Sequence, residues 1–76
     1  MLMFDVKSSN IKKAGHDPVK NVLRVEFSSG TEYEYQKVDA RTFSALISAK
    51  SQGKFFNKNI KNTFAGSRVT ENSNNA

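Results

Sequence analysis

The chain has 76 residues, no cysteine, one histidine and a formal net charge of +5. A single small domain fits this length, and it leaves little room for a deep, water-excluding active site. The composition excludes disulfides and thiolate chemistry, and the lone His16 and scattered carboxylates offer no metal-ligand spacing, so we expect no catalytic residue, metal or cofactor.

The N-terminal residues do not form a targeting segment. A charge occurs by Asp5, and no apolar run has the length of a signal peptide core or a membrane-spanning helix. We therefore expect a cytoplasmic protein without a membrane partner.

Three strands are predicted, at about Ile11–His16, Val22–Phe27 and Thr31–Gln36. The second and third alternate apolar and polar residues with a period of two. The segment 17–21 has the composition of a turn that joins the first two strands. Ile11 and Ala14 have opposite parity, which predicts a bulge near Gly15.

The loop between the second and third strands fixes their register. Ser28, Ser29 and Gly30 suit a three-residue hairpin loop with glycine in the left-handed position. This loop pairs Val25 with Tyr33 and Leu23 with Tyr35, so the large apolar groups share one face. On the other face, it sets Arg24 opposite Glu34 and Glu26 opposite Glu32.

Two helices are predicted after the strands. Asp39 is a suitable N-cap for the first, whose apolar stripe at Phe43, Leu46 and Ile47 should end by Gly53. The second should run from about Lys54 to Phe64, with Phe56, Ile60, Thr63 and Phe64 on its apolar side. Residues 65–76 hold no large apolar group beyond Val69 and should be a disordered tail.

The predicted fold is therefore α+β, a three-stranded antiparallel meander followed by two helices packed on one face (β-β-β-α-α). Residues 1–64 form one domain in this prediction.

The excess positive charge lies in residues 37–64, which hold six basic side chains and only Asp39 as an acid. At 100° per residue, Lys54, Lys58 and Lys61 form a stripe on the second helix, and Lys50 lies one turn upstream. Aromatic and amide groups alternate with these lysines in Gly53–Lys61. This combination is typical of a surface that holds a phosphate backbone, although a solvated helix face has the same composition.

The chain resembles the KTSC domain family over roughly residues 6–64. The resemblance rests on these segments and positions: Ser8-Ser9-Asn10-Ile11, Gly15-x-Asp17, Leu23-x-Val25-x-Phe27, Gly30, Tyr33-x-Tyr35, Val38, Phe43, Leu46, Ala49, Ser51-x-Gly53, Phe55-Phe56-Asn57 and Ile60. The chain departs from the family pattern at Ala14 and His16. The family occurs at the C-terminus of some lysyl-tRNA synthetases and as free-standing bacterial and phage proteins. RNA binding is the function usually suggested for this family, because the domain is attached to a synthetase, and the resemblance implies the same function for this chain.

Several candidate residues have two interpretations. Phe55 either stacks on a base or fills the gap between the helices, and Asn57 either contacts a nucleotide or caps local backbone. Tyr33 and Tyr35 resemble a stacking pair on a sheet, but the register favours packing against the helices. We interpret His16 as a surface or turn histidine.

The leading hypothesis is a small non-enzymatic module that binds RNA or single-stranded nucleic acid. Its predicted nucleic-acid-binding residues are Lys50, Lys54, Phe55, Asn57, Lys58 and Lys61, with Arg41 adjacent. The alternative is a protein-interaction module that docks on an acidic partner or self-associates through the edge strand carrying Lys12 and Lys13. An enzyme is the weakest interpretation, and the sequence predicts no oligomeric state.

Overall fold

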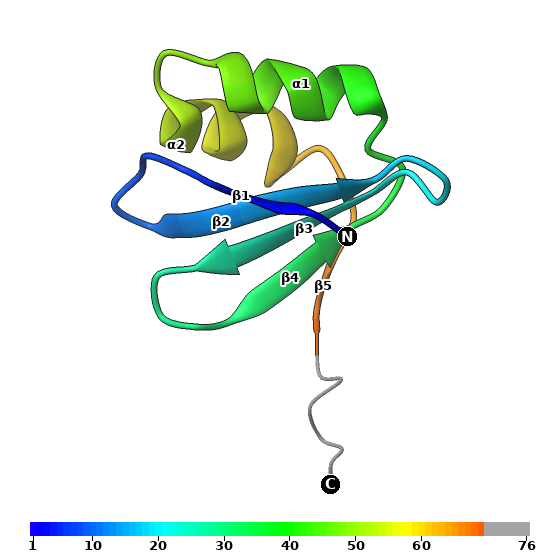
Figure 1. Ribbon diagram of the computed structural model, residues 1–76, viewed down its shortest axis with the longest axis horizontal. Coiled ribbons are helices and arrows are strands. Elements are labelled where there is room, and N and C mark those ends of the chain that lie inside the picture. The colour runs from blue at the N-terminus through cyan, green and yellow to red at the C-terminus, as the bar shows by residue number, and fades with distance from the viewer. Residues whose placement is uncertain (70–76) are drawn as a thin grey trace, which may run out of the picture.

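The computed structural model describes residues 1–69 and has two layers (Figure 1). One layer is a five-stranded antiparallel sheet in the order β1-β2-β3-β4-β5, and the helices cover one face of it. Its strands are β1 (Met3–Asp5), β2 (Ile11–Asp17), β3 (Val22–Phe27), β4 (Glu32–Tyr35) and β5 (Gly66–Arg68). Its helical segments are α1 (Ala40–Ser48), α2 (Gln52–Phe55) and the π-helical turn η1 (Phe56–Ile60).

The β3–β4 hairpin has the predicted register. Val25 lies opposite Tyr33, and Leu23 lies opposite Tyr35. The amide of Phe27 donates to the carbonyl of Thr31 at 2.8 Å, which closes the three-residue loop. Gly30 in this loop has φ of +95°, a conformation that side-chain-bearing residues rarely adopt.

The predicted bulge in β2 is present, but at another residue. The register of β2 against β3 shifts between Ile11 and Lys13, not near Gly15. An extra residue at Lys12 lets Ile11 and Ala14 both face the helices, and both are buried.

The sheet has two more strands than the sequence predicted. β1 pairs with β2, with Phe4 opposite Ala14. The strand that carries Lys12 and Lys13 is therefore not an edge, and the correct edge strand on this side is β1. Its three residues are too few to show an alternating pattern.

The second added strand lies in the segment predicted to be disordered. Residues 66–68 form β5 and pair with β4, so the prediction of disorder is wrong for them; residues 70–76 lie outside the described residues. Backbone groups hold the strand, because the amide of Gln36 donates to the carbonyl of Ala65 at 2.9 Å and that of Val69 to Glu32 at 2.8 Å. The ordered fold thus continues past the predicted domain end at residue 64.

The helical layer begins as predicted and then departs from the prediction. The Asp39 side chain accepts from the Thr42 amide at 2.9 Å, which caps α1. α1 ends at Ser48, before Gly53 as predicted, and Gly53 itself lies within α2. The second helix was predicted at 54–64, but its two segments begin at Gln52 and end at Ile60. In η1 the amide of Lys61 donates to the carbonyl of Phe56 at 2.9 Å, the i→i+5 bond of a π turn.

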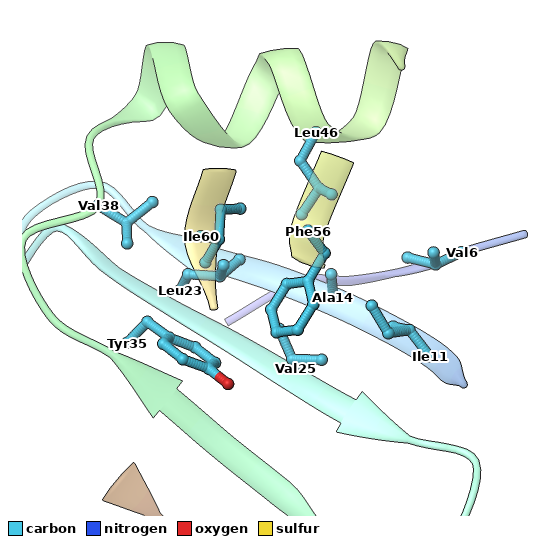
Figure 2. Packing of buried hydrophobic residues seen from close by; sticks show 10 residues of the cluster. All are labelled: Val6, Ile11, Ala14, Leu23, Val25, Tyr35, Val38, Leu46, Phe56 and Ile60. Atoms are coloured by element: carbon cyan, nitrogen blue, oxygen red, sulfur yellow. The ribbon is translucent and has the colours of Figure 1, made fainter. Parts of the chain in front are cut away.

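A single hydrophobic core lies between the sheet and the helices (Figure 2). Phe56 is its largest fully buried side chain, and its ring meets Tyr35 edge-on at 5.5 Å. The core consists of Val6, Ile11, Ala14, Leu23, Val25, Tyr35, Val38, Leu46, Phe56 and Ile60. Tyr35 is therefore a core residue, as the hairpin register predicted.

Candidate nucleic-acid interface

Four of the predicted site residues are exposed lysines on the helical side of the molecule: Lys50, Lys54, Lys58 and Lys61. Within residues 1–69 none of them forms an ion pair. Both ion pairs of this part of the chain join Arg24 to glutamates on the outer face of the sheet. The lysine charges are therefore not neutralised by carboxylates of the described chain.

The π turn changes which of these side chains lie together. The helical wheel assumed 100° per residue, but the bond from Lys61 to Phe56 encloses one residue more than an α turn. Lys61 lines a surface hollow together with Asn57, whereas Lys50, Lys54 and Lys58 do not line it. The candidate site thus consists of four exposed lysines of the helical segment and a hollow that one of them, Lys61, lines.

The hollow lies where the helices leave part of the inner sheet face uncovered. It has a volume of about 570 Å³ and is open to solvent. Its lining residues are Ser8, Asn10, Ile11, Phe27, Ser28, Ser29, Thr31, Tyr33, Tyr35, Gly53, Phe56, Asn57 and Lys61. Many of them belong to the segments on which the family resemblance rests, so those segments meet at one place in the fold.

Short contacts place α2 beside the hollow. The side chain of Gln52 accepts from the Lys7 amide and donates to the Ile47 carbonyl, both at 2.8 Å. A Cβ atom on Gly53 would lie 2.8 Å from Ser8 Oγ, so a larger residue here would require the Ser8 side chain to move. The loop before β2 and the start of α2 therefore form one wall.

Aromatic rings line the sheet side of the hollow. Tyr33 meets Phe27 edge-on at 5.7 Å and stacks at 6.3 Å with Tyr35. Tyr33 and Phe27 are half-buried, whereas Tyr35 is only 6% exposed. The two tyrosines thus differ: Tyr35 packs in the core, and Tyr33 keeps an accessible part of its ring in the hollow.

Some polar groups of the hollow lack a partner. Within residues 1–69 the side-chain amides of Asn10 and Asn57 and the Tyr35 hydroxyl form no hydrogen bond. Ser8 differs, because its Oγ accepts from the Asn10 amide at 3.2 Å. Burial raises the pKa of the Tyr35 phenol, so this hydroxyl stays protonated and can donate.

The outer face of the sheet has a different electrostatic character. Arg24 donates from Nε to Glu34 at 3.1 Å, as the register predicted, and its Nη1 lies 3.7 Å from Glu32. Arg24 therefore relieves the unfavourable pairing of Glu32 with Glu26. A mixed, internally paired face of this kind is a poor surface for a polyanion.

The structure also bears on the sequence interpretations of Phe55 and His16. Phe55 is half-buried and packs against the core, which favours a packing role over an exposed stacking platform. His16 is not a turn residue: it lies in β2, its Nε2 is 2.6 Å from the Val38 carbonyl, and its ring stacks on Phe43 at 5.4 Å. It therefore connects the sheet to the start of α1.

Sequence reasoning missed Asn10 and Phe27, which line the hollow, and it did not place Arg68 beside Tyr33. The hairpin register already placed Phe27 on the face of Tyr33, which was a usable signal. Arg68 pairs with Tyr33 across β5 and so lies on the same face. No pattern in the sequence indicated this position, because β5 was not predicted.

Neither a metal centre nor a membrane-spanning helix is present in the described part of the chain. In residues 1–69 no group of three or more His, Cys, Asp or Glu side chains is placed to hold a metal ion. The helices of the same residues are too short and polar to cross a bilayer.

Comparisons with known proteins agree on one family. A sequence profile for the KTSC domain matches residues 7–64. The crystal structure of a KTSC domain protein from Yersinia pestis superimposes with a TM-score of 0.86 at 32% identity, over 91% of this chain and 97% of that one. A protein from Stutzerimonas stutzeri, described only as uncharacterised, is 41% identical over 74% of this chain and 79% of its own length. A lysine–tRNA ligase from Nostoc is 40% identical over 76% of this chain, which corresponds to only 10% of the ligase.

Proposed function

Since the chain belongs to the KTSC domain family, we propose that it is a non-enzymatic module that binds single-stranded RNA through its helical side. The observation that carries the proposal is the group of four exposed lysines without carboxylate partners in residues 1–69, one of which, Lys61, lines a hollow with aromatic rings. Lysines hold the phosphates of a strand, and aromatic rings hold its bases. The protein would act in the cytoplasm, where RNA is available.

The distribution of charge supports one binding face. The helical side carries unpaired lysines, whereas on the outer sheet face Arg24 is paired with two glutamates. A strand would therefore be attracted to the helical side and would not be held by the outer face.

The similarity to a lysine–tRNA ligase also supports an RNA ligand. That protein acts on tRNA, and it contains a segment 40% identical to this chain. The matched segment is only 10% of the ligase. We propose that a contact with RNA is what such a small segment contributes.

The test is a titration of a fluorescent eight-nucleotide RNA at two salt concentrations. The variant Lys54→Glu/Lys58→Glu should bind more weakly, and its log–log salt slope should fall by about 0.7 for each phosphate that it no longer neutralises. The matched control is Lys12→Glu/Lys20→Glu, which makes the same change in net charge at exposed lysines outside the helical segment. Equal loss of affinity in both variants would show that net charge alone drives binding and would reject the helical face.

A protein partner is the second candidate function. Met1, Leu2 and Phe4 are exposed apolar side chains at or beside the edge strand β1, a composition typical of contact surfaces. An acidic protein could also bind the lysines. The same titration separates the two ideas, because under the protein-partner candidate RNA binding would follow net charge alone, and both double variants would lose the same affinity.

A further inference from the structure

We infer that the hollow beside η1 holds one base of a single RNA strand, whose phosphates lie along the helix lysines. This inference rests on the proposed function and adds a binding position to it. It places base recognition at Tyr33, Asn10 and Asn57, and not at Phe55, whose ring packs against the core.

The size and lining of the hollow suit a nucleotide. Its volume of about 570 Å³ lies within the range of roughly 300–1,000 Å³ that is typical of small-molecule sites. Phe27 and Tyr33 present ring surface from the sheet, and Phe56 closes the hollow from the helix. A flat, uncharged ring system that enters here gains stacking contact without displacing any core side chain.

The unpartnered polar groups favour a ligand with a hydrogen-bonding edge. The Tyr35 side chain lines the hollow, yet the residue is only 6% exposed and its hydroxyl has no hydrogen-bond partner in residues 1–69. In Figure 2 its oxygen points away from Val38, at the far end of the ring from the β4 backbone. The hollow is open to solvent, so this hydroxyl is free of protein partners and a base edge that displaces water can hydrogen-bond to it. The free amides of Asn10 and Asn57 provide further donors and acceptors around the same space.

The charges at the hollow favour a phosphate on either side of the base. Lys61 lines the wall formed by η1, and Arg68, although it does not line the hollow, pairs in the sheet with the lining residue Tyr33. Among the described residues, no acidic side chain lines the hollow. A nucleotide within a strand carries a phosphate on both sides of its base, so it matches this arrangement better than an acidic peptide, which has no flat ring system to stack.

The experiment compares eight-nucleotide RNAs of A, C and U with an abasic RNA of the same length and charge. Fluorescence anisotropy should show the preferred intact RNA binding on the order of tenfold more tightly than the abasic one. Tyr33→Leu should remove most of this difference, and so should Asn57→Leu, while both variants keep the affinity for abasic RNA. Asn59→Leu is the matched control, an exposed asparagine of η1 that does not line the hollow, and it should behave as wild type.

Intrinsic fluorescence gives a second measurement at the site. The chain has two tyrosines and no tryptophan, and both tyrosines line the hollow. Binding of the preferred RNA should quench tyrosine emission, whereas the abasic RNA should not. Circular dichroism of each variant checks that it is folded.

The outcomes distinguish the inference from the proposed function. Equal, salt-dependent binding of intact and abasic RNA would overturn the base site and leave the lysine face standing. Absence of binding by every RNA at low salt would reject the proposed function itself. A third outcome is that uridine, cytidine or adenosine monophosphate quenches the tyrosine emission at the same concentration as the octamers. The hollow would then bind free nucleotides, and the inference that it holds a base of an RNA strand would be wrong.

Discussion

At the scale of single residues, Asp39 shows how a local contact starts the helical layer. Its carboxylate accepts the Thr42 amide at 2.9 Å, and this backbone hydrogen bond holds the pKa of Asp39 below its usual value. The unfolded chain therefore takes up the proton at a higher pH than the folded chain does. The stabilisation is present above the unfolded pKa, and it is lost as the pH falls through the lower, folded pKa.

We therefore expect Asp39→Ala to lower the melting temperature at pH 7 by a few degrees, and by much less in strong acid. Thermal unfolding followed by circular dichroism at pH 7 and at a pH well below the usual aspartate pKa of 3.8 measures the difference. Asp39→Asn serves as the control, because asparagine caps a helix without titrating. A difference between wild type and Asp39→Ala that does not change with pH would contradict the role of the charged cap.

At the scale of elements, β5 depends on the absence of a side chain. Gly66 lies opposite Tyr35 on the inner face, and a Cβ atom there would come within 2.7 Å of Tyr35 Cδ2 and closer still to Cε2. The ring of Tyr35 is held by the core, so it has little freedom to move aside. The last strand is thus joined to the core through a glycine.

We expect Gly66→Ala to reduce the free energy of unfolding by about 1–3 kcal/mol, the usual cost of overpacking. The control is Ser67→Ala, one residue along, whose side chain lies on the outer face opposite Glu34. Urea unfolding of both variants provides the measurement. Equal stability of the two would mean that β5 contributes nothing through Tyr35.

The elements also show what the sequence could and could not predict. β3, β4, their register and the cap of α1 were predicted because each leaves a local pattern: alternating side chains, a glycine loop, an aspartate before an apolar stripe. β5 leaves none, because Gly66, Ser67 and Arg68 pair through the backbone and bury no large side chain. The π turn likewise has no sequence marker, so the position of Lys61 at the hollow was not foreseeable, and neither was its proximity to Asn10.

At the scale of the whole molecule, the two layers separate two kinds of surface. Figure 1 shows the helices on one face of the sheet. The outer sheet face carries the ion pairs of Arg24, while the helices carry exposed lysines and the inner sheet face carries the aromatic rings of the hollow. A ligand that follows the charges meets only one side of the protein. The RNA-bound surface should therefore be continuous and confined to that side.

An NMR titration with the preferred RNA would test this division. Amide shift changes should concentrate in residues 50–61 and around the hollow, including Thr31 and Tyr33. The amides of Arg24 and Glu26, on residues whose side chains face outward, should change least. Changes centred on β1 would instead support the protein-partner candidate.

In chain length, the π turn corresponds to an α-helical turn with one extra residue between Phe56 and Ile60. We expect that deleting one of residues 57–59 restores an α-helical turn and leaves Phe56 and Ile60 buried. The helix would then lose a residue without a change of fold. Variation in chain length at this point would alter the side chains offered to a ligand and leave the scaffold as it is.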